Sequence, residues 1–376
     1  MKKFISVLVL VCIMASFCTV SAFAEGEALV DTEAELRAAL LDSSITTITL
    51  EGSITVNAES GNNFALEIKR PVTINGNGNT IESSAGRVIN VETTGEVTIE
   101  NINITGTSQR GVNIINQTVT VNLNSVNITA PTYAVMLATS SASSTLNING
   151  GTYTSNANTI NIAGPSSKVT INNAVLITND TNPNEDYGTV CTYVTAGGSQ
   201  ITVNGGSVTY NKNDGKGGTG RCLRSCSLDS FSYNTTMNGG GFEACVAYIE
   251  YPGQTAYAFS TIDGSIEKAE DGKTIEIIRD VDMGGQIVDV NKNITIDMNG
   301  KKITNGALKL AEGVTVTVVN WPGTEAELEQ FLSGKLPVPN RYNVPSTADN
   351  SNMPLWAVLF IGFAAVALLT GKKRRA

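Results

Sequence analysis

The segment Val72-Thr73-Ile74-Asn75-Gly76 alternates apolar and polar residues and ends at two residues that favour turns. This alternation, rich in β-branched residues, is typical of a β-strand with one buried side. Asparagine and glycine tolerate the positive φ of a tight turn. The pattern recurs at intervals of 25, 22, 27, 23 and 32 residues, in segments that start at Val97, Val119, Leu146, Val169 and Ile201. Such units predict a parallel β-solenoid, in which stacked coils bury a continuous core.

Asparagine is concentrated in the repeats. Of 38 asparagines, 24 lie between Asn57 and Asn184. At a repeated corner, an asparagine amide can hydrogen-bond to its equivalent on the next coil. We therefore expect a mainly structural role for these residues, and hydrogen bonding to sugars is the alternative.

The sequence predicts two short helices, one ahead of the repeats and one near the end of the chain. Thr32-Glu33-Ala34-Glu35 is a capping-box sequence that opens an amphipathic helix, Leu36 to Leu41, ahead of the first strand. We expect it to cap the solenoid. The same Thr-Glu-Ala-Glu-Leu sequence recurs at 324–328 and predicts another short helix.

A longer internal repetition marks the second module. Residues 70–81 align without gaps to residues 292–303, and a helix-like stretch over 262–269 and a strand over 274–278 precede the second copy. We expect an all-β chain: a parallel β-helix over 25–255, with a short N-terminal capping helix, and a shorter β-solenoid-like module over 256–320. A short helix and a proline-containing linker follow over 321–353.

Both ends of the chain have the pattern of membrane-targeting segments. Lys2 and Lys3, an apolar run and Ala22-Phe23-Ala24 predict a secretory signal peptide over 1–24. The uncharged, largely apolar segment 354–371 is long enough for a transmembrane helix, and the four cations in 372–376 predict a cytoplasmic tail. The residues between the two segments are therefore expected to be exported.

The linker carries a sequence that resembles the C-terminal sorting signal of Gram-positive surface proteins. That signal consists of a Leu-Pro-x-Thr-Gly-type motif, an apolar helix and a basic tail. The motif here is Val344-Pro345-Ser346-Thr347-Ala348, with Val and Ala in place of the usual Leu and Gly. The resemblance implies that a sortase cuts after Thr347 and joins the protein to peptidoglycan. The alternative is a permanent membrane anchor.

The composition excludes several kinds of chemistry. The chain has no histidine, which rules out a Ser-His-Asp or Cys-His nucleophile and His-ligated zinc. The exported part carries 34 acids against 19 cations, a net charge of −15. Bulk charge of this sign argues against nucleic acid as a partner.

Residues 28–210 resemble the pectate-lyase-like right-handed parallel β-helix family. Glu33 to Leu40, Thr47 to Leu50 and Pro71 to Gly78 follow the family's usual cap and first coils. The resemblance implies the fold better than an activity, because many relatives are non-catalytic surface proteins. Enzymes of this family use clustered aspartates, with calcium and an Arg or Lys base in the lyases. No aspartate lies between Asp42 and Asp180.

One polar segment has the spacing of a calcium-binding loop. Asp180, Asn182, Asn184 and Asp186 place oxygens at positions 1, 3, 5 and 7. However, Pro183 breaks the usual turn and Cys191 stands where a bidentate glutamate belongs. An acidic surface loop without a metal is the alternative.

Four cysteines remain after the signal peptide is removed: Cys191, Cys222, Cys226 and Cys245. An even number in an exported region suggests up to two disulfides, with three pairings. Zinc held by four thiolates and buried free thiols are the alternatives.

These features predict a non-catalytic protein anchored to the wall or membrane of a Gram-positive cell. Its polar outer faces would serve adhesion or display by binding an extracellular glycan or protein, with no cofactor beyond the candidate calcium. The alternative function is an anchored polysaccharide lyase or glycoside hydrolase.

Overall fold

The computed structural model describes residues 26–180, 188–213, 221–250 and 257–337. The predicted signal peptide, sorting motif, transmembrane helix and basic tail lie outside these residues. Among the described residues, no helix is long and apolar enough to cross a membrane.

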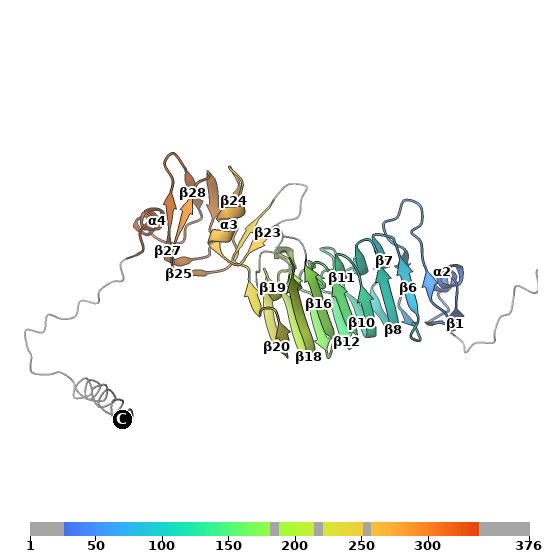
Figure 1. The fold of residues 1–376 in the computed structure, drawn as a ribbon. Helices are drawn as coiled ribbons and strands as arrows, with labels where there is room; N and C mark the ends of the chain where they lie inside the picture. The colour runs from blue at the N-terminus through green and yellow to red at the C-terminus, as the bar shows by residue number, and fades with distance from the viewer. Residues whose placement is uncertain (1–25, 181–187, 214–220, 251–256, 338–376) are drawn as a thin grey trace, which may run out of the picture.

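The repeats form a right-handed parallel β-solenoid, as predicted (Figure 1). Its coils contribute strands to two parallel sheets. Sheet A consists of β1 (Glu27–Val30), β2 (Thr47–Leu50), β3 (Ile54–Thr55), β5 (Val72–Asn75), β6 (Thr80–Ser83), β8 (Gly95–Gly106), β10 (Val119–Thr129), β12 (Thr145–Asn149), β13 (Thr152–Ser155), β15 (Lys168–Asn172), β16 (Val175–Asp180), β18 (Ser199–Lys212) and β20 (Leu228–Asn238). Sheet B consists of β4 (Leu66–Ile68), β7 (Arg87–Val91), β9 (Arg110–Ile114), β11 (Tyr133–Leu137), β14 (Ile160–Ile162), β17 (Gly188–Thr192), β19 (Arg221–Ser225) and β21 (Phe242–Ala244). A short 3-10 helix, η1 (Val194–Ala196), follows β17.

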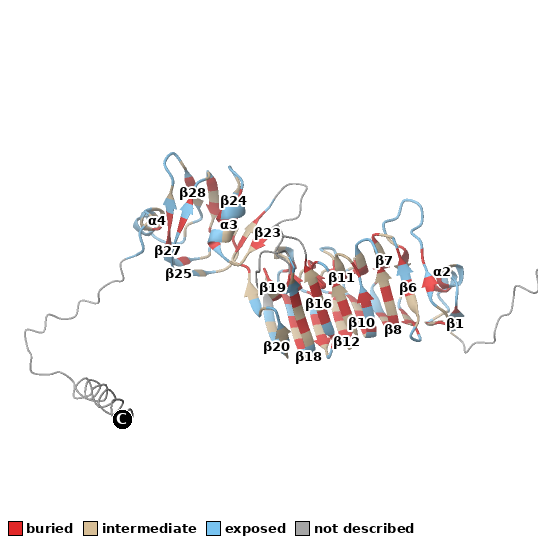
Figure 2. Ribbon diagram, viewed as in Figure 1, coloured by how far each residue is buried: buried red, intermediate tan, exposed pale blue. Residues whose placement is uncertain are grey.

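The core is a set of apolar rows that run from coil to coil. In one row the inward side chains are almost completely buried and are paired in register: Ile74, Ile99, Leu123, Ile148, Ile171 and Val203. Figure 2 shows buried positions in every coil of the solenoid. Each coil therefore completes its neighbour's core, which explains the repeated alternation in the sequence.

The structure corrects the alignment of one repeat. Val97 pairs with Val121 and not with Val119, which instead lies beside Gly95. The shift is two residues, so the same side chains face the core and the alternation alone could not detect it.

Residues with positive φ turn the chain at the corners. Asn101, Ser125 and Asn173 have φ of 50°, 54° and 51°, and Gly150 and Gly205 occupy the same corner on other coils. This left-handed region is accessible to asparagine and glycine at low cost, which accounts for their recurrence at the ends of the strand repeats.

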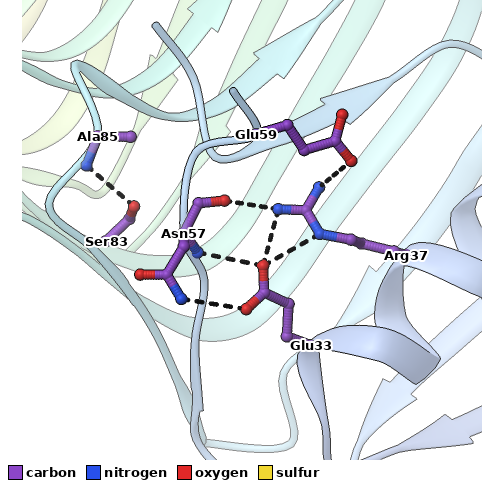
Figure 3. A network of polar contacts seen from close by, with 6 residues as sticks. All are labelled: Glu33, Arg37, Asn57, Glu59, Ser83 and Ala85. Carbon is purple, nitrogen blue, oxygen red and sulfur yellow. Dashed lines mark hydrogen bonds and ion pairs between the residues drawn. The ribbon is translucent and has the colours of Figure 1, made fainter. Parts of the chain in front are cut away.

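Helix α2 (Glu33–Leu41) is the predicted N-terminal helix, and Thr32 caps it by accepting a hydrogen bond from the Glu35 backbone. Figure 3 shows how it is fixed to the loop after β3. Arg37 donates to Glu33 at 2.8 Å, to Glu59 at 3.2 Å and to the Asn57 carbonyl at 2.6 Å. The Asn57 backbone and side-chain amides in turn donate to Glu33.

The second module has its own two sheets and helices. Sheet C consists of β22 (Ala247–Ile249), β23 (Tyr257–Phe259), β24 (Thr274–Ile277), β26 (Ile294–Asp297) and β28 (Val316–Val319); β25 (Val281–Val290) and β27 (Ile303–Leu310) form sheet D. Its helices are α3 (Ile262–Lys268) and α4 (Glu325–Leu332). The change between modules lies between β21 and β22, ahead of residue 256, and α4 packs on β27.

The gapless internal repetition corresponds to equivalent structure. Arg70 donates to the carbonyls of Ala39 and Leu40 at the end of α2, and Lys292 donates to those of Ile266, Glu267 and Ala269 at the end of α3. In each module a cation thus satisfies helix C-terminal carbonyls, where positive charge is favourable.

Candidate functional site

The outer face of sheet A carries asparagines that hydrogen-bond from one coil to the next. We call these residues the asparagine ladder. The side-chain amide of Asn149 donates to Asn124 at 2.9 Å, that of Asn172 to Asn149 at 2.8 Å and that of Asn204 to Asn172 at 3.0 Å. Asn147 likewise donates to Asn122. The structural interpretation of these asparagines is confirmed, because their amides bond from coil to coil.

A shallow groove of about 460 Å³ lies at the corner beside this ladder. Asn75, Asn77, Asn101, Asn103 and Asn127 are among its lining residues. Asn127 donates to Asn103 at 3.0 Å, so part of its hydrogen-bonding capacity is used within the fold. The groove offers amides and no charged side chain, which suits weak contact with hydroxyl groups.

A different arrangement lies on the outer face of sheet B. We call Arg87, Arg110, Tyr133 and Tyr193 the arginine–tyrosine face. Arg87 and Arg110 are directly opposite each other on β7 and β9, and Tyr133 is opposite Arg110 on β11. The Arg110 guanidinium lies 5.4 Å from the centre of the Tyr133 ring, and the Tyr133 and Tyr193 hydroxyls are 3.3 Å apart.

Buried amides support this face from below. Arg110 donates to the Asn113 side-chain oxygen at 2.8 Å, and Asn113 donates to Asn90 at 2.8 Å. Asn90 and Asn113 are 1% and 0% exposed. Since the supporting amides have fixed partners, the orientation of the Arg110 guanidinium is fixed as well.

The two arginines place uncompensated positive charge on an acidic protein. Within the described part of the chain, neither Arg87 nor Arg110 forms an ion pair with a carboxylate, and the buried Arg87 Nε has no hydrogen-bond partner. Burial and the nearby Arg87 lower the pKa of Arg110. Adjacent guanidinium groups with free donors are suited to binding an anionic group, above all a carboxylate.

Two carboxylates close to this face, Glu67 and Glu92, interact with each other and with a lysine. Glu67 is opposite Asn90, and its side chain is hydrogen-bonded to Glu92 and ion-paired to Lys69 at 2.9 Å. The hydrogen bond to Glu67 raises the pKa of Glu92. The described residues also include no group of three acids or cysteines that could hold a metal.

Asp180, the first residue of the candidate calcium loop, is engaged within the solenoid. It is completely buried, and its Oδ2 accepts hydrogen bonds from Tyr210 at 2.5 Å and from Lys212 at 2.8 Å. Asn182, Asn184 and Asp186 lie outside the described residues. The calcium site therefore stays a prediction. To bind calcium, Asp180 would have to give up its ion pair with the Lys212 ammonium group.

The four cysteines are buried and have free thiols. Cys222 donates to the carbonyls of Val208 and Asn238 inside the coil, while Cys226 and Cys245 lie in one small apolar cluster. The disulfides among these four cysteines stay a prediction. The sorting motif, Val344 to Ala348, lies outside the described residues.

The arginine–tyrosine face was not anticipated, although the sequence contains a signal for it. Arg87-x-x-Asn90 and Arg110-x-x-Asn113 are the same motif, 23 residues apart. In β7 and β9 the four residues that follow the arginine are all buried, so a search for strict alternation does not reveal the motif. A search for polar residues repeated at the coil length would have found the pair.

A match to one family model supports the fold and a likeness to adhesive domains. Residues 27–133 match the family model described as a putative pectate lyase-like adhesive domain. No curated protein matches this chain. One solved structure, "L. reuters 100-23 SRRP", is 15% identical and aligns over 80% of this chain and 97% of its own, with a TM-score of 0.31. The matched family region contains Arg87 and Arg110 and ends at Tyr133.

Proposed function

We propose that this protein is a non-catalytic cell-surface adhesin whose arginine–tyrosine face binds a glycan that carries carboxylate groups. The observation that carries the proposal is the adjacent pair Arg87 and Arg110, which form no ion pair with a carboxylate among the described residues. Arg110 also lies over the ring of Tyr133, whose hydroxyl is close to that of Tyr193. The match of residues 27–133 to an adhesive-domain model supports the same role.

The chemistry of the face fits an acidic sugar. Each guanidinium can bind a carboxylate with two parallel hydrogen bonds. A tyrosine ring offers an apolar surface for the C–H groups of a sugar ring and a hydroxyl at its edge. Because Arg87 and Arg110 belong to adjacent coils, their backbones are about 5 Å apart. This spacing places both guanidinium groups within reach of a single sugar residue.

The termini supply the proposed location. The signal peptide would export the chain, and the sorting motif with the segment 354–371 would leave it on a Gram-positive cell, joined to peptidoglycan by a sortase or held in the membrane. Intact mass of protein released from the wall distinguishes these outcomes. A C-terminus at Thr347 with a peptidoglycan fragment indicates sortase processing, and a full-length chain in the detergent fraction indicates a membrane anchor.

Binding is tested with the double variant Arg87→Gln/Arg110→Gln. We expect its affinity for an immobilised uronic-acid polysaccharide to fall at least about tenfold, because two charge-assisted contacts are lost. Lys168→Gln removes a positive charge at an exposed position of sheet A and is the matched control. Carboxyl-reduced polysaccharide should bind the unaltered protein as weakly as the double variant binds the native polymer. Equal affinity of the double variant and the control would refute this site.

The enzyme alternative is tested with the same polymer. Incubation of the protein with polygalacturonate, with and without calcium, is expected to produce neither new reducing ends nor unsaturated products. Either product would replace the adhesin by a hydrolase or a lyase.

A further inference from the structure

Two cysteines lie side by side where the solenoid ends. Strands β19 and β21 pair in parallel, with Ser225 opposite Ala244, and Cys226 and Cys245 are the next residues of these strands. The backbone ladder continues through them, since Cys245 N–H donates to the Ser225 carbonyl at 2.6 Å and Cys226 N–H to that of Thr192 at 3.2 Å. Neighbouring strands are about 4.8 Å apart, and disulfides join Cα atoms about 4.4–6.8 Å apart.

The side chains of this pair also meet. Cys226 and Cys245 are 3% and 0% exposed, and together with Ala258 they form a separate apolar cluster. Their thiols are hydrogen-bonded to each other. Cys222, by contrast, donates to the backbone carbonyls of Val208 on β18 and Asn238 on β20, and Cys191 is opposite Arg224.

We propose that Cys226 and Cys245 form a disulfide that closes the last coil of the β-helix at the junction with the second module. The oxidising surroundings that maintain such a bond are those of an exported protein, so persistence of the bond in the cell rests on the proposed surface location. The geometry of the pair does not depend on the glycan-binding site.

The junction offers a route for the oxidant. A pocket of about 450 Å³ reaches Cys226 and is also lined by two cations, Arg279 and Lys301, and one acid, Glu276. The excess of positive charge favours an anionic molecule such as oxidised glutathione. The Cys226 thiolate attacks one sulfur of the external disulfide and releases one thiolate. The Cys245 thiolate then attacks the Cys226 sulfur and releases the second, and the two protein thiol protons pass to the released thiolates.

In the reduced protein, the hydrogen bond from Cys226 and the nearby Arg224 guanidinium lower the pKa of Cys245 to about 6, against the opposing effect of burial, and the same hydrogen bond raises the pKa of Cys226. This hydrogen bond ends when Cys226 enters the mixed disulfide, and the Arg224 guanidinium then remains to favour the Cys245 thiolate in the second step. Thiolate, and not thiol, is the attacking species in disulfide exchange.

The bond would fix the point at which the chain changes architecture. Val246 follows Cys245 directly, and its backbone bonds to Phe259 in β23 and to Ile278 after β24. A covalent link from Cys245 back to Cys226 would therefore join the second module to the penultimate coil. In an adhesin anchored at its C-terminus, force on the bound ligand can extend the polypeptide between the ligand site and the anchor. The disulfide would shorten the part of the chain that can extend.

The test uses the full chain treated with oxidised glutathione, or with reduced dithiothreitol, and then alkylated under denaturing conditions. We expect one cross-linked peptide pair after cleavage at aromatic residues, because Phe231, Tyr233 and Phe242 lie between the two cysteines and no Lys or Arg does. We also expect the oxidised protein to melt several degrees above the reduced protein.

Four single variants complete the design. Cys226→Ser and Cys245→Ser should abolish the redox-dependent shift in melting temperature, whereas Cys191→Ser and Cys222→Ser should retain it. Four alkylated thiols among the exported cysteines after oxidation, or a cross-link that includes Cys191 or Cys222, would overturn the proposal. Binding to the uronic-acid polysaccharide is measured on the same samples. Lost binding with an intact cross-link contradicts the glycan site alone, and retained binding without a cross-link contradicts the disulfide alone.

Discussion

At the scale of single residues, the ladder asparagines stabilise the stack of coils. Asn149 accepts from Asn172 and donates to Asn124, so Asn149→Ala removes two hydrogen bonds between coils. Since this side chain is exposed, we expect a loss of about 1 kcal/mol in the free energy of unfolding. Chemical denaturation measures the change. Asn156→Ala, at an exposed asparagine outside the ladder, is the control. Equal effects at the two sites would mean that the ladder contributes no stability.

The ion pair of Asp180 and Lys212 should contribute much more. Asp180 is fully buried and the Lys212 side chain is 9% exposed. Asp180→Ala leaves a buried ammonium without this carboxylate, and we expect a loss of about 3–5 kcal/mol. Asp289→Ala breaks an exposed pair with Lys309 and should cost less than about 1 kcal/mol. Thermal denaturation compares the two variants, and a similar small loss in both would contradict the buried pair's role.

The same measurement tests the calcium prediction. If Asp180 serves the fold through Tyr210 and Lys212, the melting temperature of the unaltered protein should be the same in millimolar calcium and in chelator. A rise of several degrees with calcium would show that residues 180–186 bind the metal.

At the scale of elements, the sequence predicted strands and caps well and interactions across coils poorly. The helix opened by Thr32 and the strand Val72–Asn75 follow from local chemistry, namely a capping side chain and period-2 burial. The register of Val121 against Val97 depends on the neighbouring coil, which local alternation does not encode. The arginine–tyrosine face was missed for the same reason. Tyr133 and Tyr193 are 60 residues apart and meet only because coils stack.

The pairing of β24 with β26 brings two carboxylates together and should make the second module sensitive to pH. Glu276 lies opposite Asp297, and burial, Asp297 and Glu250 raise its pKa above the ordinary value of 4.5. A raised pKa in the folded state gives stability that is present below the unfolded pKa and is lost as pH rises through the folded pKa. The contribution of Glu276 to the stability of the second module should therefore be less favourable at pH 7 than at pH 4.

The variant Glu276→Gln isolates this effect. It keeps an oxygen to accept from Asn299 and removes the charge, so it should raise the melting temperature at pH 7 and have little effect at pH 4. Glu312→Gln, at an exposed glutamate, is the control. A stabilisation by Glu276→Gln that is the same at both pH values would contradict the electrostatic explanation.

At the scale of the whole molecule, the chain contains two separate cores. The larger runs through the solenoid from Val30 to Leu223, and the smaller extends from Ala247 to Phe331 in the second module. Among the described residues, the apolar cluster between them is the small one that contains Cys226 and Cys245. Cooperativity in a solenoid passes through contacts between neighbouring coils. This narrow apolar connection should therefore limit how far destabilisation spreads.

Two matched substitutions test whether the modules unfold independently. Ile99 lies in the larger core and Ile296 in the smaller one, and both side chains are 0% exposed. Each residue occupies an inward position of a strand, β8 and β26 respectively. Each change to alanine should cost about 2–5 kcal/mol, because it removes buried apolar surface and leaves a cavity. In calorimetry of the reduced protein we expect two transitions, with Ile99→Ala lowering one and Ile296→Ala the other by several degrees. If both variants lowered a single shared transition, the modules would be one cooperative unit. Tension applied at the proposed C-terminal anchor would then reach the arginine–tyrosine face without a weak point between them.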